Sequence, residues 1–418
     1  MTNILRQETS LSPYRVLDLT DEKGYMCGQI LGGLGADVLK IEPPGGDRGR
    51  RIGPFYKDIV KPENSLYWFA YNVNKRSITL GLEKSEGREI FKILIKATDF
   101  VVESFPPGHM DKLGLGYSVL SQINPGIIYT AITPYGQSGP YSKFTGSDIT
   151  CMAASNYMWL SGDADRAPLR ISVPQAYIHG GSEAAMASLI AFWHRQLTGE
   201  GQVVDVSIQE SLLWMCLNAQ ATWDLNHVLL KREGQFRVFG SYRMRQIFKC
   251  KDGHVVYMMI GGSVGTRGQK ALVKWMDGEG MANDLLKSIQ WETFDARTYD
   301  DQLSRQLEPL FERFFLTKTK QELFKAALKM SFLLAPLENI VDVLQSEHFR
   351  ARDFWVEIQH PEFDANLTYP GAPFKSNEVS WVFNRRPPLI GEHNDEVYGQ
   401  ELGLSKKQMA FLKQSEVI

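Results

Sequence analysis

The chain has few cysteines and no long apolar segment. Only four of its 418 residues are cysteine, and they stand far apart, at Cys27, Cys151, Cys216 and Cys250. Because they form no CxxC pair, the sequence predicts neither a disulfide framework nor a structural zinc site, and unpaired thiols are typical of a reducing compartment. No apolar run reaches the ~18 residues of a transmembrane helix, and the first residues lack the pattern of a signal peptide. We therefore expect a cytoplasmic protein.

An excess of charge of either sign is also absent. The chain has 46 basic and 48 acidic residues, a formal net charge of -2. This balance provides no overall attraction to nucleic acid or to an anionic membrane, so neither is an expected partner. The hydrophobic content of 43% is ordinary for a globular protein and excludes a disordered or low-complexity chain.

What is present is an alternation of strand and helix patterns. Apolar segments predict strands at residues 14–19, 35–42, 76–80, 99–103, 126–132 and 203–207. Helices are predicted at residues 24–33, 85–97 and 176–197, with Ser85 as a helix N-cap. Such alternation favours an α/β fold with a mostly parallel sheet. The character of the sequence changes after about residue 225 and again from residue 336.

Six segments occur in an order that resembles the class III CoA-transferase family, which also includes the α-methylacyl-CoA racemases. They are Gly32–Asp47, Asn72–Leu80, Val102–Gly116, Asn124–Pro140, Thr198–Ser207 and Gly391–Leu404. Each segment alone is weak evidence for the family, but the six occur in the family's order and together span nearly the whole chain. The resemblance implies a discontinuous Rossmann-like large domain at 1–225 and 336–418, a smaller α+β domain at 226–335, and two chains interlocked as a dimer.

The resemblance also implies a binding site for coenzyme A or an acyl-CoA as substrate, with no metal and no covalently bound cofactor. CoA carries phosphates and an adenine, which call for cations, backbone N–H groups and flat surfaces. The residues implied as CoA contacts are Asn74, Lys75, Arg76, Ser104, Phe105, Gly108, Lys112 and Tyr135. The alternative for each Lys or Arg is a solvated surface charge. Pro43 stands where relatives often carry an arginine, and the basic group Arg48, Arg50 and Arg51 lies nearby.

The sequence departs from the family at its nucleophile. In the family, an aspartate attacks the donor thioester, forms a mixed anhydride, and then carries CoA as an aspartyl thioester before the acceptor acid takes it. The family pattern is similar to Ala-Asp-x-x-x-Gly, and here it reads Ala176-Tyr177-x-x-x-Gly181. A phenol is protonated at neutral pH and cannot become an acyl-CoA thioester. The sequence therefore predicts no catalytic residue in this chain, with Tyr177 in the nucleophile position.

Other positions of the family site also differ. Glu183 and His179 lie near Tyr177, but Glu183 is on another face of the helix and His179 has the wrong chemistry for a thioester carrier. Glu22 or Lys23 stands at a glutamine-like family position. A racemase would need a histidine where Ser147 stands.

Two glycine- and histidine-containing segments have open interpretations. Residues 261–265 are either a mobile glycine loop over the acyl site, as the family implies, or an ordinary turn. His393 is interpreted as a structural residue of the C-terminal turn rather than a ligand.

These observations lead to one leading hypothesis and two alternatives. The leading hypothesis is the non-catalytic subunit of a heteromeric CoA-transferase, whose paralogous catalytic subunit supplies the aspartate. The family includes two-subunit enzymes of this kind, for example succinyl-CoA:benzylsuccinate CoA-transferase. The alternatives are a self-sufficient homodimeric CoA-transferase that uses another residue, and a non-enzymatic CoA-binding or regulatory protein.

Overall fold

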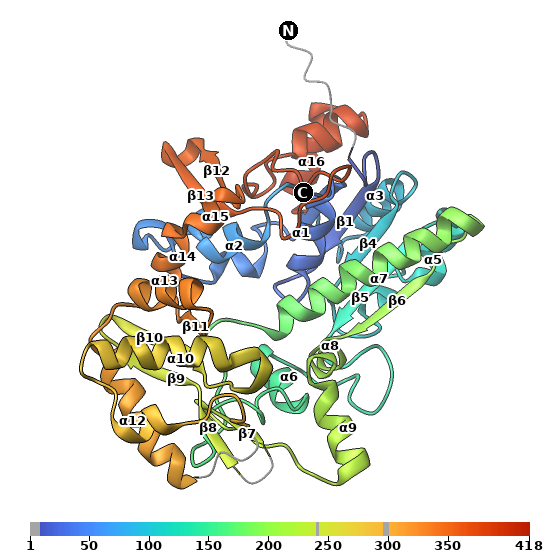
Figure 1. Ribbon diagram of the computed structural model, residues 1–418. Coiled ribbons are helices and arrows are strands. Elements are labelled where there is room, and N and C mark those ends of the chain that lie inside the picture. The colour runs from blue at the N-terminus through green and yellow to red at the C-terminus, as the bar shows by residue number, and fades with distance from the viewer. Residues whose placement is uncertain (1–8, 240–241, 296–300) are drawn as a thin grey trace. The chain divides into compact units, whose positions relative to one another are not determined.

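The computed structural model describes residues 9–239, 242–295 and 301–418 (Figure 1). The chain divides into two compact units. The large unit comprises the chain up to Met158, Arg170–Val228 and Ala351–Ile418, and the small unit comprises Trp159–Leu169 and Leu229–Arg350. These bounds differ from the predicted division at residues 225 and 336, because 159–169 and 336–350 belong to the small unit.

The large unit contains a six-stranded sheet in the order β3-β2-β1-β4-β5-β6 (Figure 1). Its strands are β1 (Arg15–Leu19), β2 (Asp37–Glu42), β3 (Lys75–Thr79), β4 (Phe100–Glu103), β5 (Ile128–Thr133) and β6 (Val203–Ser207). All five pairings are parallel, and Val16 of the central strand pairs with Val38 on one side and Phe100 on the other. The predicted parallel sheet and its strands are confirmed within about two residues at each end.

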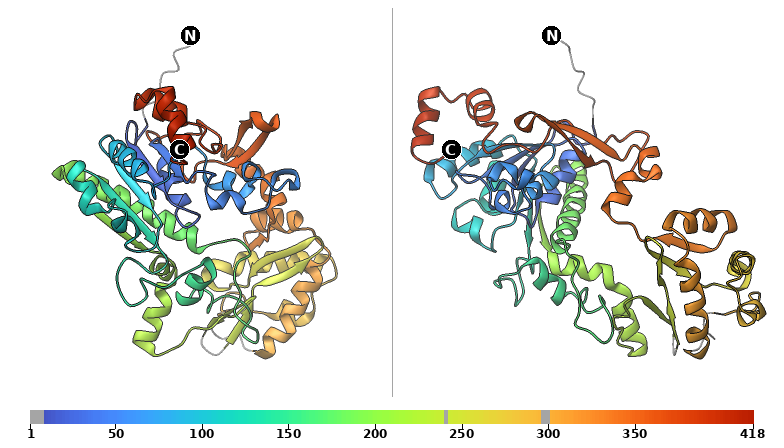
Figure 2. Two further views of the ribbon diagram at one scale, coloured as in Figure 1. Left: turned by 180° about the vertical axis from the view of Figure 1, so that it is seen from behind. Right: turned by 90° about the vertical axis from the view of Figure 1, so that its left-hand side faces the viewer.

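Helices cover both faces of the sheet. Successive side chains of a strand point to opposite faces, so each strand contributes to two separate cores. Leu17 of β1 contributes to the core under α3 (Ser85–Ile95), α5 (Tyr117–Ile123) and α16 (Lys406–Gln414). Val16 contributes to the core under α1 (Tyr25–Gly33), α7 (Ala176–Thr198) and α8 (Ile208–Leu213). Figures 1 and 2 show α7 as the longest of these helices, lying along the sheet.

Small residues let α7 pack closely against α1. A Cβ at Gly181 would lie 2.9 Å from the Met26 side chain and 3.2 Å from the backbone nitrogen of Cys27, so only glycine allows this approach. Ala184, Ala185 and Ser188 continue the buried face. The helix ends at Gly199, whose φ of +80° suits glycine. The predicted helix at 176–197 is therefore confirmed.

The remaining elements of the large unit surround this sheet. They are α2 (Leu66–Tyr71), α4 (His109–Lys112), α6 (Asp148–Ala154), α9 (Leu217–Asn226), the antiparallel hairpin β12 (Trp355–His360) and β13 (Ala365–Pro370), and a π-helical turn (Asp395–Glu401). The C-terminal segment attaches to β3: the N–H of His393 donates to the carbonyl of Ser77, and the ring Nδ1 of His393 accepts from the N–H of Ser77. His393 thus has the structural role predicted for it.

The small unit contains an antiparallel sheet in the order β11-β10-β9 and the hairpin β7–β8. Its elements are β7 (Phe236–Phe239), β8 (Tyr242–Arg245), β9 (Ile247–Cys250), β10 (Gly253–Met258), β11 (Leu333–Pro336), α10 (Gly262–Gly278), α11 (Asp284–Ser288), α12 (Asp301–Phe315), α13 (Lys320–Met330), α14 (Ile340–Gln345) and, at its end, α15 (Glu347–Ala351). Phe248, Tyr257 and Phe315 pack edge-to-face in its core.

Two local predictions require correction. Residues 262–265 form the first turn of α10, so the segment 261–265 is neither a loop nor a simple turn. The N-cap of α3 is Lys84, and Ser85 is the first helical residue, whose hydroxyl donates to Glu86 instead of capping a backbone N–H. Within the described ranges, no helix has the length and apolar character needed to span a membrane.

Candidate functional site

A cavity of about 730 Å³ opens at the carboxyl edge of the parallel sheet. It is lined by residues at or just beyond the ends of four strands: Leu19 at the end of β1, Pro43 after β2, Ser104 after β4 and Pro134 after β5. The order β3-β2-β1-β4 reverses direction between β1 and β4. Ligands of open α/β sheets bind at such a switch point, outside the carboxyl ends of the strands. The position of the cavity is therefore a consequence of the topology.

Three of the predicted CoA-contacting residues line this cavity together. Ser104 and Phe105 follow β4 directly, and Lys112 ends the short helix α4. Gly108 adopts a φ of +77° as the N-cap of α4. It therefore shapes the turn that brings Lys112 to the cavity, although it does not line the cavity itself.

The loop after β5 adds residues that the sequence reasoning missed. Lys143 and Phe144 line the cavity, and the exposed ring of Phe144 stacks on Tyr141 at 5.1 Å between ring centroids. The predicted contact Tyr135 instead packs edge-to-face against Tyr141 and is absent from the lining. The sequence signal that could have identified Lys143 and Phe144 is the position of their loop, which follows a predicted strand.

The second predicted group, residues 74–76, lies elsewhere. Lys75 is fully buried, and its Nζ donates to Asp18 Oδ2 at 2.8 Å and to Asn72 Oδ1 at 3.0 Å. Arg76 is bound by Asp37, Glu396 and Glu401. These side chains do not line the cavity at the carboxyl edge, so the structure does not bring them together with Ser104, Phe105 and Lys112.

The direction of β3 explains this separation. Lys75 and Arg76 begin the strand and Asn74 precedes it, and the amino ends of parallel strands lie at the edge of the sheet opposite to the carboxyl ends. Asn74 has a φ of +66°, and its side chain binds the backbone of Val382 and Asn384. Asn74 and Arg76 line a separate polar cavity of about 590 Å³. Their role in the structure is to attach the C-terminal segment.

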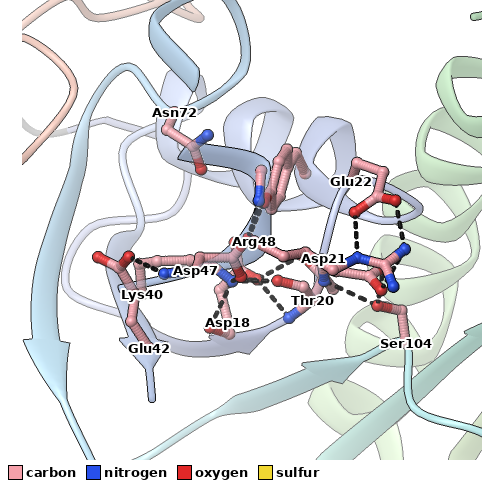
Figure 3. A network of polar contacts seen from close by, with 12 residues as sticks. Asp18, Thr20, Asp21, Glu22, Lys40, Glu42, Asp47, Arg48, Asn72 and Ser104 are labelled. Atoms are coloured by element: carbon pink, nitrogen blue, oxygen red, sulfur yellow. Dashed lines mark hydrogen bonds and ion pairs between the residues drawn. The ribbon is translucent and has the colours of Figure 1, made fainter. Parts of the chain in front are cut away.

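Four polar residues of the cavity lining, Asp21, Lys23, Arg48 and Ser104, form with Glu22 a chain of polar contacts that we call the polar bridge. Figure 3 labels all of them except Lys23. Ser104 Oγ donates to Asp21 Oδ1 at 2.8 Å, and Asp21 pairs with Lys23. Arg48 Nη2 lies 3.2 Å from Asp21 Oδ2, and both Arg48 Nε and Nη2 donate to the carboxylate of Glu22. Burial alone would raise the pKa of Asp21, but Lys23 and Arg48 hold it below its ordinary value.

A buried network anchors the loop that carries this bridge (Figure 3). Asp18 Oδ1 accepts from both the N–H and the hydroxyl of Thr20, and Lys40 Nζ donates to the carbonyl of Thr20. Asp18 and Lys40 are fully buried. Because Thr20 immediately precedes Asp21, these contacts fix where the bridge begins.

Glu103 is a titratable group directly behind the cavity wall. It ends β4, it is buried, and its carboxylate accepts from the N–H of Phe105 at 2.6 Å and from the Tyr129 hydroxyl at 3.3 Å. Burial raises the pKa of Glu103 to about 7. The sequence reasoning did not single out this residue, since its burial follows only from the packing of the sheet.

Tyr177 lies in the first turn of α7, half-buried and outside the cavity lining. The turn is anchored by Asp148, whose Oδ1 accepts from the N–H of Gln175 at 2.7 Å and of Ala176 at 2.8 Å. Burial and then the negative charge of Glu22 raise the pKa of Tyr177 above its ordinary value. The phenol is therefore neutral at physiological pH and offers no carboxylate chemistry.

The alternative residues near this position do not reach the cavity either. His179 packs against Tyr157, with 6.1 Å between ring centroids, and neither His179 nor Glu183 lines the cavity. Ser147 is the N-cap of α6 and shares a capping box with Thr150. Among the described residues, no group of acidic, histidine or cysteine side chains is arranged to hold a metal ion.

Comparison with known proteins identifies the family. The model of CoA-transferase family III matches residues 11–394. Succinyl-CoA:(R)-benzylsuccinate CoA-transferase subunit BbsE of Thauera aromatica is 35% identical, over 92% of this chain and 93% of the relative. Formyl-CoA:oxalate CoA-transferase of Streptomyces coelicolor is 31% identical, over 98% and 99%. The beta subunit of succinyl-CoA--L-malate CoA-transferase of Chloroflexus aurantiacus is 29% identical, over 98% of each chain.

A solved structure agrees with this assignment. The CAIB/BAIF family protein from Brucella suis superimposes with a TM-score of 0.81 and 28% identity, covering 94% of this chain and 100% of that protein. The resemblance seen in the six sequence segments is therefore confirmed over nearly the whole chain. The chain belongs to CoA-transferase family III.

Proposed function

We propose that this chain is the CoA-binding, non-nucleophilic subunit of a heteromeric CoA-transferase, which moves CoA between an acyl-CoA and a carboxylic acid. The observation that carries the proposal is Tyr177, a neutral phenol in the first turn of α7 where the family's aspartate is expected. The relatives BbsE and the malate CoA-transferase beta subunit are both named as subunits of succinyl-CoA-dependent enzymes. Succinyl-CoA is accordingly the donor we propose.

The cavity at the carboxyl edge is the proposed CoA site. Lys112 and Lys143 are exposed and have no ion-pair partner within the described part of the chain. Two free cations suit the phosphates of CoA, and the rings of Phe105 and Phe144 in the same lining suit its adenine. Ser104 completes the set of predicted contacts that we retain.

An exposed apolar face supports association with a second chain. Met186, Ile190, Trp193 and Leu197 recur at helical spacing along α7 and are 53%, 63%, 66% and 70% exposed. A contiguous apolar stripe of this kind marks a protein interaction surface. We propose that the partner is a paralogous chain that carries the nucleophilic aspartate and that the two chains interlock, as the family implies.

Native mass spectrometry of the protein from its source tests this proposal. We expect an equimolar complex with a second chain of similar mass. After incubation with succinyl-CoA, we expect hydroxylamine-sensitive CoA on the second chain only, because a thioester requires a carboxylate. A homodimer of this chain that transfers CoA would contradict the proposal and favour a self-sufficient enzyme. Binding of CoA without transfer in any complex would favour a regulatory protein.

A further inference from the structure

Among the residues that the structure describes, those of helix α9 are unusual because none of their side chains is buried. The apolar residues before, within and after this helix are exposed: Leu213 43%, Trp214 66%, Met215 48%, Leu217 50%, Trp223 54%, Leu225 79%, Val228 50% and Leu229 54%. The helix continues from α8 away from the parallel sheet (Figures 1 and 2). In the described part of the chain, α9 thus has no hydrophobic core to pack against.

A helix of this length is not stable by itself. Helix α9 has 10 residues, and isolated helices shorter than ~12–15 residues are marginal in water, because most helical stability comes from packing of an apolar face. With about 3.6 residues per turn, Leu217, Trp223 and Leu225 lie on three different sides of α9. A helix that is apolar on all sides is normally buried. Helix α9 therefore requires a covering surface from outside the chain.

The composition of residues 213–229 favours a protein as the source of that surface. Asp224 is the only Asp, Glu, Lys or Arg among them. Helices that bind a membrane surface carry Lys and Arg on a polar face, which this segment lacks. Depletion of charge together with enrichment of Trp and Met is typical of the core of a protein–protein interface.

The exposed area is large enough for a stable interface. The two tryptophans expose on the order of 250 Å², and the six other apolar side chains bring the total to roughly 500–800 Å². The largest apolar patch of a typical monomer is about 300–600 Å², and each partner of a stable complex contributes about 800 Å². Residues 213–229 thus provide most of one side of an interface.

We propose that residues 213–229 are covered by the paralogous subunit and that α9 is a stable helix only in that complex. The proposal rests on the proposed function, since it takes the covering chain to be that subunit. It adds a second interaction surface to the apolar stripe of α7 and couples the folding of α9 to assembly. In the chain alone, the amides of α9 are then open to solvent exchange.

Hydrogen–deuterium exchange measured by mass spectrometry tests the proposal without a variant. The complex purified from its source is compared with this chain produced alone. We expect the amides of Leu217–Asn226 to exchange at least ~100-fold more slowly in the complex, because opening an uncovered segment costs almost no free energy. The central strand β1 should be protected in both samples, which shows that the chain produced alone is folded.

A charge placed in the segment tests it in the complex. Leu225→Glu changes a side chain that is 79% exposed in this chain. Burial of an unpaired carboxylate opposes association, so we expect the dissociation constant of the complex to rise at least ~100-fold. Leu328→Glu is the matched control, the same substitution on α13 at a side chain that is 67% exposed, and should change that constant by less than ~3-fold. Sedimentation velocity of the two co-expressed chains measures both.

The outcomes separate this inference from the proposed function. Fast exchange of α9 in an equimolar complex with the second chain would overturn the inference and leave the proposed function intact. Equally slow exchange in the chain alone would also overturn it, as would an equal loss of the complex in both glutamate variants. A homodimer as the only assembly would instead overturn the proposed function, and the choice of covering chain with it. If the chain alone does not fold, the two variants of the complex decide.

Discussion

The lysines inside the sheet and the lysines of the cavity carry the same charge in opposite surroundings. Lys40 and Lys75 are fully buried, and each is bound by Asp18 and by backbone carbonyls. Lys112 and Lys143 are exposed at the cavity, with no ion-pair partner in the described part of the chain. A buried charge is tolerated only when it is paired and hydrogen-bonded, whereas an unpaired exposed charge remains available for a ligand. The comparison separates cations that stabilise the fold from cations that suit binding.

The largest expected effect comes from removing one partner of a buried pair. Lys75→Met leaves Asp18 buried without its closest cation, so we expect the free energy of unfolding to fall by about 3–5 kcal/mol. Urea denaturation measures this change. Lys112→Met is the matched control, and its effect should stay within about 0.5 kcal/mol because the side chain is exposed. Equal losses in both variants would break the comparison between the two kinds of lysine.

The next effect concerns the buried acid behind the cavity wall. Burial raises the pKa of Glu103 from its ordinary value of 4.5 to about 7 in the folded chain. The folded state therefore holds its proton more tightly than the unfolded state. The stabilisation that protonated Glu103 gives to the folded chain is fully present below pH 4.5 and is lost as the pH rises toward 7.

The free energy of unfolding of the wild type should fall between pH 4.5 and 7 by on the order of 3 kcal/mol at most. Glu103→Gln should reduce this fall, because glutamine does not titrate. Thermal unfolding across this pH range measures it. Glu83→Gln, a change at an exposed side chain, serves as a control that should retain the wild-type slope. A Glu103→Gln profile that parallels the wild type would show that Glu103 is ionised in the folded chain.

A moderate effect is expected at the cavity. Lys112→Ala and Lys143→Ala should each weaken CoA binding by ~5–30-fold, since each removes a charge-assisted contact worth about 1–2 kcal/mol. The loss should shrink as the salt concentration rises, because exposed charges are screened. Titration calorimetry at two ionic strengths measures both. Lys84→Ala, a change at an exposed lysine outside the cavity lining, should have no effect.

The smallest effect is expected from the aromatic ring beside Lys143. Phe144→Leu retains an apolar side chain but removes the flat surface, so we expect CoA affinity to fall by ~2–10-fold. A probe that lacks adenine, such as phosphopantetheine, should bind both proteins equally. If phosphopantetheine binding falls as much as CoA binding does, Phe144 does not contact the adenine.

Sequence patterns predicted the strands and the main helices closely, because apolar periodicity and turn residues are local signals. The strand predicted at 35–42 is β2, Asp37–Glu42, and the helix predicted at 176–197 is α7, Ala176–Thr198. The N-cap predicted at Ser85 was wrong, and neither interpretation left open for residues 261–265, a loop or a turn, matches the helix start found there, since helix starts depend on local backbone geometry that composition does not fix. Lys143 and Phe144 were missed because they lie in a loop without a periodic pattern.

The sequence by itself determined the family, the parallel α/β sheet and the chemical nature of the side chain at position 177. These follow from residue types and their order, which are read without coordinates. Only the tertiary structure decided which cations are free. Lys75 and Lys112 look equally suited to a phosphate in the sequence, yet one is buried against Asp18 and the other is exposed at the cavity. The reason is physical: pairing and burial depend on residues distant in the chain, which only the folding of the sheet brings together.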